Sequence, residues 1–127
     1  MILVDTSVWV DHLRSGNAVL AGLLESGMVM THPFVIGEIA LGDLHRRQAV
    51  RAALSGLPRA STVTDGEVMD FIERHRLWGR GIGYVDCHLL AAVRLSAGAT
   101  LWAHDKRLHA AAADLDLATD VSLRRQP

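Results

Sequence analysis

The sequence predicts an α/β fold in which helices cover a central, mostly parallel sheet. Short apolar runs rich in branched residues alternate with longer segments of helical spacing, a pattern typical of parallel sheets covered on both faces. The 127 residues suit one domain spanning 1–127. Half of the residues (50%) are hydrophobic and 21% are charged. This composition is that of a globular protein and argues against disorder.

The first elements follow from short apolar runs and turn residues. Residues 1–4 form a continuous apolar run and predict a strand buried on both faces. A turn at 15–17 precedes a predicted helix over 18–25, which ends at Ser26-Gly27. Residues 28–31 predict a second short strand.

The middle of the chain predicts one long helix and a third strand. Pro33 suits the first turn of a helix, and the apolar spacing over 34–44 continues as a basic amphipathic segment over 45–54. Gly56-Leu57-Pro58 ends this helix. Residues 60–63 predict the third strand.

The last third predicts two strands and three helices. Thr64 or Asp65 caps a helix that runs to about His75, with Glu67 placed as in a capping box. Another helix begins at Tyr84 or Val85 and ends before Gly98. The remaining predicted elements are a strand over 100–103, a helix over 105–113 and an edge strand at 117–118.

Composition also limits the setting of the protein. Cys87 is the single cysteine, so no intramolecular disulfide forms, and a reducing compartment, by default the cytoplasm, is expected. No run approaches the roughly 18 apolar residues of a membrane span, and the N-terminus lacks the features of an export signal. The net charge of −1 indicates that any nucleic acid is bound by a local patch.

Four carboxylates stand in apolar or uncharged surroundings: Asp5, Glu38, Asp86 and Asp105. Burying an unpaired carboxylate costs several kcal/mol or shifts its pKa, so each needs a partner. Asp5 and Asp105 follow predicted strands, and parallel α/β sheets place their sites at the carboxyl ends of strands. Because Glu38 and Asp86 lie near helix starts, all four can meet at one sheet edge.

Converging carboxylates predict a metal site. Carboxylates about 4 Å apart repel by roughly 4 kcal/mol at an effective dielectric of 20, which a divalent cation offsets. Oxygen ligands without a Cys/His set favour Mg²⁺ or Mn²⁺ over zinc, and such sites commonly hydrolyse phosphodiesters. The alternative interpretation is that these acids are helix caps and surface groups, since Asp is common at helix starts.

The four acids lie in sequence blocks that resemble a known family. The blocks are Val4-Asp5-Thr6-Ser7-Val8-Trp9, Val35-Ile36-Gly37-Glu38-Ile39-Ala40-Leu41-Gly42, Gly83-Tyr84-Val85-Asp86-Cys87-His88-Leu89-Leu90-Ala91-Ala92 and Leu101-Trp102-Ala103-His104-Asp105-Lys106-Arg107-Leu108. They are similar, in order and spacing, to the motifs of PIN-domain ribonucleases, above all the VapC-type toxins of bacterial toxin–antitoxin pairs.

The resemblance implies a three-layer α/β/α sandwich with four to five strands and a Mg²⁺- or Mn²⁺-dependent endoribonuclease. It also implies a homodimer inhibited by a small cognate antitoxin. The four acids match the family's catalytic and metal-holding positions, and Thr6 or Ser7 matches a hydroxyl beside the first Asp. Ala103 stands where the family often has Thr or Ser, which makes Asp105 the least secure ligand.

Local cations are candidates for RNA contact. Arg46 and Arg47 belong to a basic stretch after Glu38, and Lys106 and Arg107 follow Asp105. Solvated helix surface is the alternative explanation for the first pair.

Two other functions compete with the nuclease. A phosphoacceptor receiver domain has similar length and topology, but the chain lacks a second acid beside Asp5 and a Lys after residues 117–118. The other is a PIN fold retained only as a binding module with a decayed site.

Overall fold

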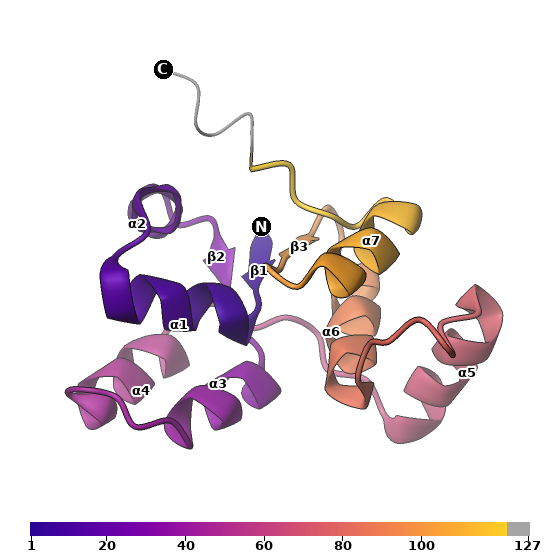
Figure 1. Cartoon of the computed structure of the whole chain (residues 1–127), viewed down its shortest axis with the longest axis horizontal. Coiled ribbons are helices and arrows are strands. Elements are labelled where there is room, and N and C mark those ends of the chain that lie inside the picture. The colour runs from indigo at the N-terminus through magenta and orange to yellow at the C-terminus, as the bar shows by residue number, and fades with distance from the viewer. Residues whose placement is uncertain (122–127) are drawn as a thin grey trace.

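The computed structural model describes residues 1–121, which form seven helices and three strands (Figure 1). The elements in chain order are β1 (Ile2–Val4), α1 (Thr6–Ser15), α2 (Ala18–Glu25), β2 (Val29–Met30), α3 (Pro33–Ala40), α4 (Arg47–Ser55), α5 (Asp65–His75), α6 (Tyr84–Leu95), β3 (Thr100–Trp102) and α7 (Lys106–Asp114). Figure 1 shows α1 to α4 on one side of the sheet and α5 to α7 on the other. The predicted α/β class with helices around a sheet is confirmed.

The sheet is parallel and has the strand order β2-β1-β3. Strand β1 is central, and its residues Leu3 and Val4 are completely buried, as expected for a strand covered on both faces. Leu3 pairs with Met30 on one side and with Leu101 on the other. The chain crosses from β1 to β2 through α1 and α2, and from β2 past β1 to β3 through α3 to α6. Because all three strands are parallel, the loops that follow β1 and β3 lie at the same edge of the sheet.

Among residues 1–121 the sheet has fewer strands than predicted. The segments at 60–63 and 117–118 are not strands. A single bridge joins Arg59, just before the first segment, to Thr31, and another joins Ala118 of the second segment to Leu101. Strand pairing near the first segment stops at one bridge because Pro58 lacks an N–H and the next helix is already capped at Thr64. The second follows a residue in the left-handed conformation, Asp116, with φ 58°.

One helix was missed, and one helix prediction was wrong. Helix α1 was not among the predicted elements, although it presents buried Val8 and Trp9 to the core. The single helix predicted over 34–54 is two helices, because the chain turns after α3 and Arg46 adopts φ 55° before α4. The apolar pattern misled at Leu41, whose side chain is 90% exposed rather than buried.

The remaining helix boundaries agree with their predicted caps. The Thr64 hydroxyl accepts the Glu67 N–H at 3.1 Å, and the Glu67 carboxylate accepts the Thr64 N–H at 3.0 Å, which completes the predicted capping box of α5. No helix among residues 1–121 is both long and apolar enough to cross a membrane.

Candidate functional site

Asp5 is held at the junction of β1 and α1. Its side chain caps α1, accepting the Ser7 N–H at 3.3 Å and the Ser7 hydroxyl at 2.7 Å. The residue is only 8% exposed. The Ser7 Oγ also accepts the backbone N–H of His104 at 3.3 Å, so one hydroxyl ties the end of β1 to the loop that follows β3. Sequence reasoning proposed Ser7 as a neighbour of Asp5 but missed its link to His104.

Asp86 faces the same edge from the first turn of α6. Its carboxylate accepts the Gly83 N–H at 2.8 Å, and the residue is half-buried. Burial raises the pKa of this carboxyl; the Gly83 hydrogen bond opposes the rise, and the negative charges of Asp5 and Asp105 add to it. Three of the four predicted acids are therefore near enough for their charges to interact, as the sequence predicted.

Glu38 reaches the site from α3 through a hydroxyl. The Thr6 Oγ1 donates to the Glu38 carboxylate at 2.8 Å. Thr6 lies in the first turn of α1, directly after Asp5, so this bond links the fourth acid to the first. Glu38 is exposed and lies inside α3, where it caps no helix.

Asp105 lies at the start of α7. Its side chain caps that helix by accepting the N–H groups of Arg107 at 2.9 Å and Leu108 at 3.0 Å. Ala103, the residue without the expected hydroxyl, is buried. Asp105 is exposed. Its negative charge acts on Asp86 by raising the pKa of that carboxyl, and this interaction, rather than a hydroxyl, connects it to the other acids.

The helix-cap interpretation holds for three of the four acids, but it is incomplete. Asp5 and Asp105 are N-caps, and Asp86 occupies the third helical position of α6 and binds the N-cap backbone. Capping explains why acids stand there; it does not explain why several gather with no counter-charge. Within residues 1–121, none of these three acids or Glu38 forms an ion pair with Lys, Arg or His.

The oxygen atoms of these four side chains suit a hard divalent cation, although the carboxylates are too far apart to bind one ion together. All four side chains supply carboxylate oxygens, which Mg²⁺ and Mn²⁺ prefer. Burial is the main cause of the raised pKa of Asp86, and the charges of Asp5 and Asp105 add a repulsion that a cation would offset. In the described part of the chain, no three His, Cys, Asp or Glu side chains are close enough to form a ligand group. The acids share one edge without forming a closed coordination shell.

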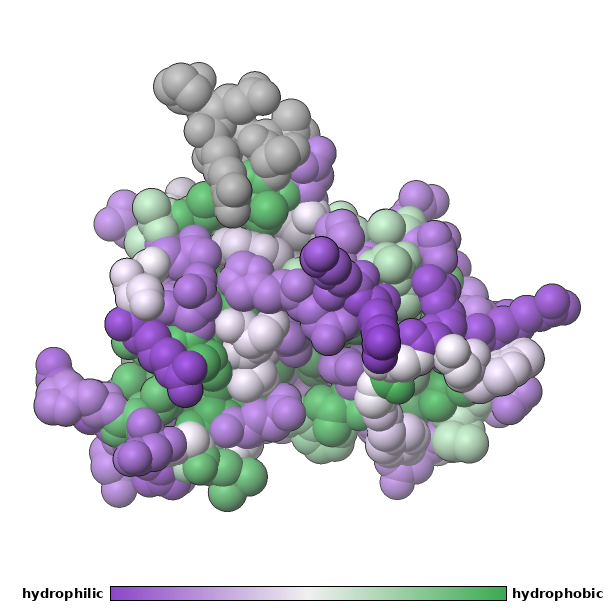
Figure 2. Space-filling view, viewed as in Figure 1, coloured by the Kyte–Doolittle hydropathy of each residue, from purple (hydrophilic) through white to green (hydrophobic). Residues whose placement is uncertain are grey.

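Two of the candidate cations lie beside this edge. The Arg107 side chain packs over Gly81 so closely that a Cβ there would lie 2.8 Å from its Cδ and Nη1. Gly81 belongs to the loop that leads to Gly83 and Asp86, so Arg107 is held next to the site. Figure 2 shows hydrophilic side chains gathered over the region where Figure 1 places α7 and this loop. Lys106 is exposed at the start of α7.

The other two cations are placed differently. Arg46 is the exposed residue before α4. The Arg47 guanidinium donates through Nε to the Ala40 carbonyl, so it closes the end of α3. Within residues 1–121, no hydrogen bond or ion pair joins either arginine to the four carboxylates, and their role as RNA contacts stays a prediction.

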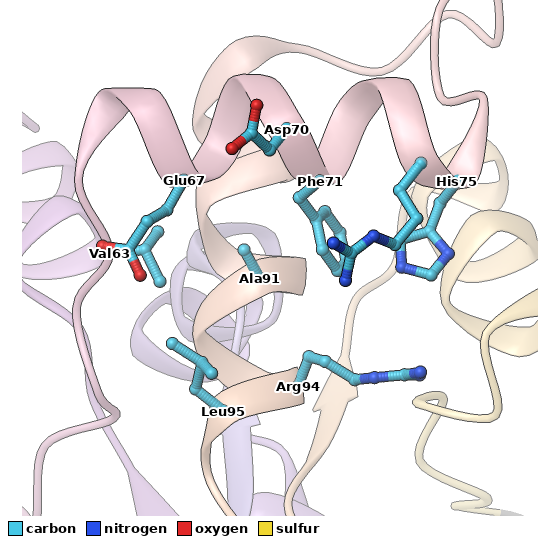
Figure 3. A pocket seen from close by; sticks show the side chains of 9 residues that line it. Val63, Glu67, Asp70, Phe71, His75, Ala91, Arg94 and Leu95 are labelled. Carbon is cyan, nitrogen blue, oxygen red and sulfur yellow. The ribbon is translucent and has the colours of Figure 1, made fainter.

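The hollow between α5 and α6 lies apart from this site. It encloses about 280 Å³ and is lined by apolar and charged side chains. Figure 3 shows Phe71, Arg94 and Leu95 around it, together with the acids Glu67 and Asp70 of α5. None of the four predicted site carboxylates lines it.

Comparisons with known proteins identify the family. The PIN domain family matches residues 2–114 of the chain. The chain belongs to the PIN domain family. Its relatives within the PIN family include Ribonuclease VapC32 of two Mycobacterium tuberculosis strains, each 49% identical over 124 residues, which cover 96% of this chain and 100% of the relative. The family resemblance inferred from the four sequence blocks is confirmed.

Solved structures share the PIN fold. Mycobacterium tuberculosis VapC20, described as a sarcin-ricin loop cleaving toxin, is 29% identical with a TM-score of 0.63, over 87% of this chain and 95% of that one. A toxin-antitoxin complex from Klebsiella pneumoniae gives 21% identity and a TM-score of 0.62, over 83% and 87% of the two chains. The second likeness shows the fold alone.

Proposed function

We propose that this PIN domain is a metal-dependent endoribonuclease that hydrolyses phosphodiester bonds in RNA and acts as the toxin of a toxin–antitoxin pair. The observation that carries the proposal is the shared edge of carboxylates without a cationic partner. The names of the relatives, Ribonuclease VapC32 and the toxin VapC20, support the same activity.

Each acid has a distinct task in this proposal. Asp5, Asp86, Glu38 and Asp105 would hold Mg²⁺ or Mn²⁺, which, when bound, supplies an activated water and charge stabilisation for phosphodiester hydrolysis. Ser7 fixes the Asp5 carboxylate by its hydrogen bond at 2.7 Å. Thr6 does the same for Glu38 at 2.8 Å. The two hydroxyls therefore limit the rotation of the acids, as outer partners of metal ligands commonly do.

Substrate phosphates require positive charge, because the net charge of the chain is −1. Arg107 is the strongest candidate, since it is held over the loop that leads to Asp86. Lys106 beside it is exposed. We place Arg46 and Arg47 as outer phosphate contacts, although Arg47 also binds the end of α3.

The proposed partners are a small cognate antitoxin and a second copy of the chain. The Klebsiella structure is a toxin-antitoxin complex, which supports the antitoxin by likeness of fold. We expect the protein to act in the cytoplasm as a homodimer or as a hetero-oligomer with its antitoxin.

The test is to map RNA ends after brief expression of wild type and Asp5→Asn. Asn retains the helix-capping acceptor, so folding should be preserved while a negative ligand is lost. Cleavage sites should appear only with wild type, and purified wild-type protein should cut the mapped RNA with Mg²⁺ and not with EDTA. Equal cleavage by Asp5→Asn would contradict the proposed site.

A second candidate function is a PIN domain that binds RNA or protein without cutting. The absence of a three-ligand group among residues 1–121 favours it, together with the missing hydroxyl at Ala103. Thermal unfolding separates the two functions, because a cation that relieves carboxylate repulsion must raise the melting temperature. A melting temperature unchanged by millimolar Mg²⁺ and Mn²⁺ would favour the binding module.

A further inference from the structure

Two exposed aromatic rings lie on helices that carry site carboxylates and share one buried support. Phe34 is 40% exposed and Tyr84 is 46% exposed. Their ring centroids lie 4.9 Å and 4.8 Å from the ring of His88, which is only 3% exposed. Both contacts are edge-to-face, a favourable geometry for aromatic rings. One buried imidazole therefore braces two surface rings on different helices.

Further contacts fix each ring on its outer side. Phe34 packs against His32 at a centroid distance of 5.1 Å. The Tyr84 hydroxyl donates to the Asp65 carboxylate at 3.0 Å, which anchors the ring to the start of α5. A flexible exposed ring loses entropy when it binds a ligand, whereas a ring already held in place loses little. The pair is therefore organised before any ligand arrives.

The rings lie on the two helices that carry Glu38 and Asp86. Phe34 precedes Glu38 by four residues on α3, so both side chains lie on one face of that helix. Tyr84 lies two residues before Asp86 on α6, so its ring leaves that helix on a different face and joins Phe34 through their shared contact with His88. Figure 1 shows α3 and α6 below the sheet, and Figure 2 shows apolar side chains reaching the surface in this region.

We propose that Phe34 and Tyr84 form a stacking surface for an unpaired RNA base next to the bond that is cut. This inference rests on the proposed function. Uncharged ring faces beside a phosphate-cleaving site match the chemistry of a nucleobase, which has an aromatic face a few ångströms from its phosphate. Proteins that recognise single-stranded RNA stack its unpaired bases on aromatic side chains. The chain should therefore cut unpaired segments in preference to duplexes.

The first test measures stacking without requiring cleavage. A single-stranded RNA carrying 2-aminopurine is titrated with protein in EDTA, where stacking quenches its fluorescence. Wild type and Tyr84→Phe should quench it, whereas Phe34→Leu and Tyr84→Leu, which retain an apolar side chain without a ring, should weaken binding about ten-fold. Leu41→Ala is the matched control, because Leu41 is 90% exposed beyond the end of the same helix. Equal quenching by all variants would overturn the proposal.

The second test uses the RNA site mapped by expression. A short RNA spanning that site is compared with one that has an abasic nucleotide beside the cut bond. The abasic change should lower wild-type kcat/KM about ten-fold and should have no further effect on Tyr84→Leu. Additive losses would refute stacking on Tyr84. Failure of wild type to cut any RNA would instead refute the nuclease, and the quenching test would still decide the stacking surface.

A protein partner on the same rings is a distinct outcome. If Phe34→Leu and Tyr84→Leu leave RNA binding and kinetics unchanged but alter the mass measured by light scattering, the rings belong to a protein interface. That result would overturn the stacking proposal.

Discussion

Acid should weaken the start of helix α3 through His32. This residue is 1% exposed, and its Nδ1 accepts the Phe34 N–H at 3.0 Å as the cap of the helix. Burial, followed by the charges of His88 and Arg59, lowers the pKa of His32 from 6.5 to about 4. The folded protein thus holds a neutral ring where the unfolded chain holds a charged one.

The loss of stability in acid follows from the difference between the pKa of His32 in the folded and in the unfolded state. Because the folded pKa is depressed, the unfolded state binds more protons between pH 6.5 and 4, and stability falls as the pH is lowered through this range. The full loss is about 3 kcal/mol, of which about 2 kcal/mol is reached at pH 5. For a domain of this size that corresponds to a melting temperature roughly 8 °C lower at pH 5 than at pH 7.5. Asp86, whose pKa is raised, acts in the opposite direction.

The contribution of His32 is isolated by comparing how strongly the free energy of unfolding depends on pH in wild type and in a variant. Thermal unfolding of wild type and His32→Asn is followed at pH 7.5 and pH 5; Asn can still accept the Phe34 N–H but does not titrate. The variant starts lower because a buried ring is lost, yet its pH dependence should be smaller by about 2 kcal/mol. His45→Asn, which changes an exposed imidazole, is the control and should follow wild type. Parallel falls in wild type and His32→Asn would refute the reasoning.

Three further results are expected. Gly81→Ala and Gly79→Ala each force φ above 70° on a residue with a Cβ, and each should lower the free energy of unfolding by about 1–2 kcal/mol. Only Gly81→Ala displaces the Arg107 side chain, so it alone should also lower RNA cleavage. Equal cleavage by the two variants would argue against a role for Arg107. Asp105→Ala should unfold more easily than Asp105→Asn by about 1 kcal/mol, because only Asn retains the cap, while both should lose cleavage if the charge binds metal. Thr6→Val should change stability by less than about 1 kcal/mol but raise the Mg²⁺ concentration needed for half-maximal cleavage, since the neighbouring glutamate loses its hydroxyl partner.

The sequence predicted those parts of the fold whose local signals agree with tertiary packing. Within the run at 1–4, the strand Ile2–Val4 is buried as predicted, and the Thr64 capping box starts α5 where expected. Local pattern failed where packing decides the outcome. Leu41 has an apolar side chain at a helical spacing but faces solvent, and the helix ends before it. The strand predicted at 60–63 failed because a single bridge is all that fits between Pro58 and the next helix.

The sequence identified residues that the structure brings to one edge, and their role as a site stays a prediction. The cost of unpaired charge identified the acids, and the charge interactions of Asp86 with Asp5 and Asp105 agree with the predicted meeting place. The braced rings were not predicted as a pair, because the contact between Phe34 and His88 depends on the approach of α3 to α6. The contact between Tyr84 and His88 is an i,i+4 pair within α6, a spacing that the sequence analysis did not use.

The three aspartates both cap helices and belong to the proposed metal site. Their presence in a relative of this chain is therefore weak evidence that the relative is an active nuclease. Asp5, Asp86 and Asp105 each complete a helix start. A copy that had stopped cutting RNA would still unfold more easily without them, so folding alone could preserve them. Glu38 completes no helix end, and its side chain accepts a hydrogen bond from the Thr6 hydroxyl. Loss of this glutamate is therefore the earlier sign that a PIN domain of this type has become a binding protein.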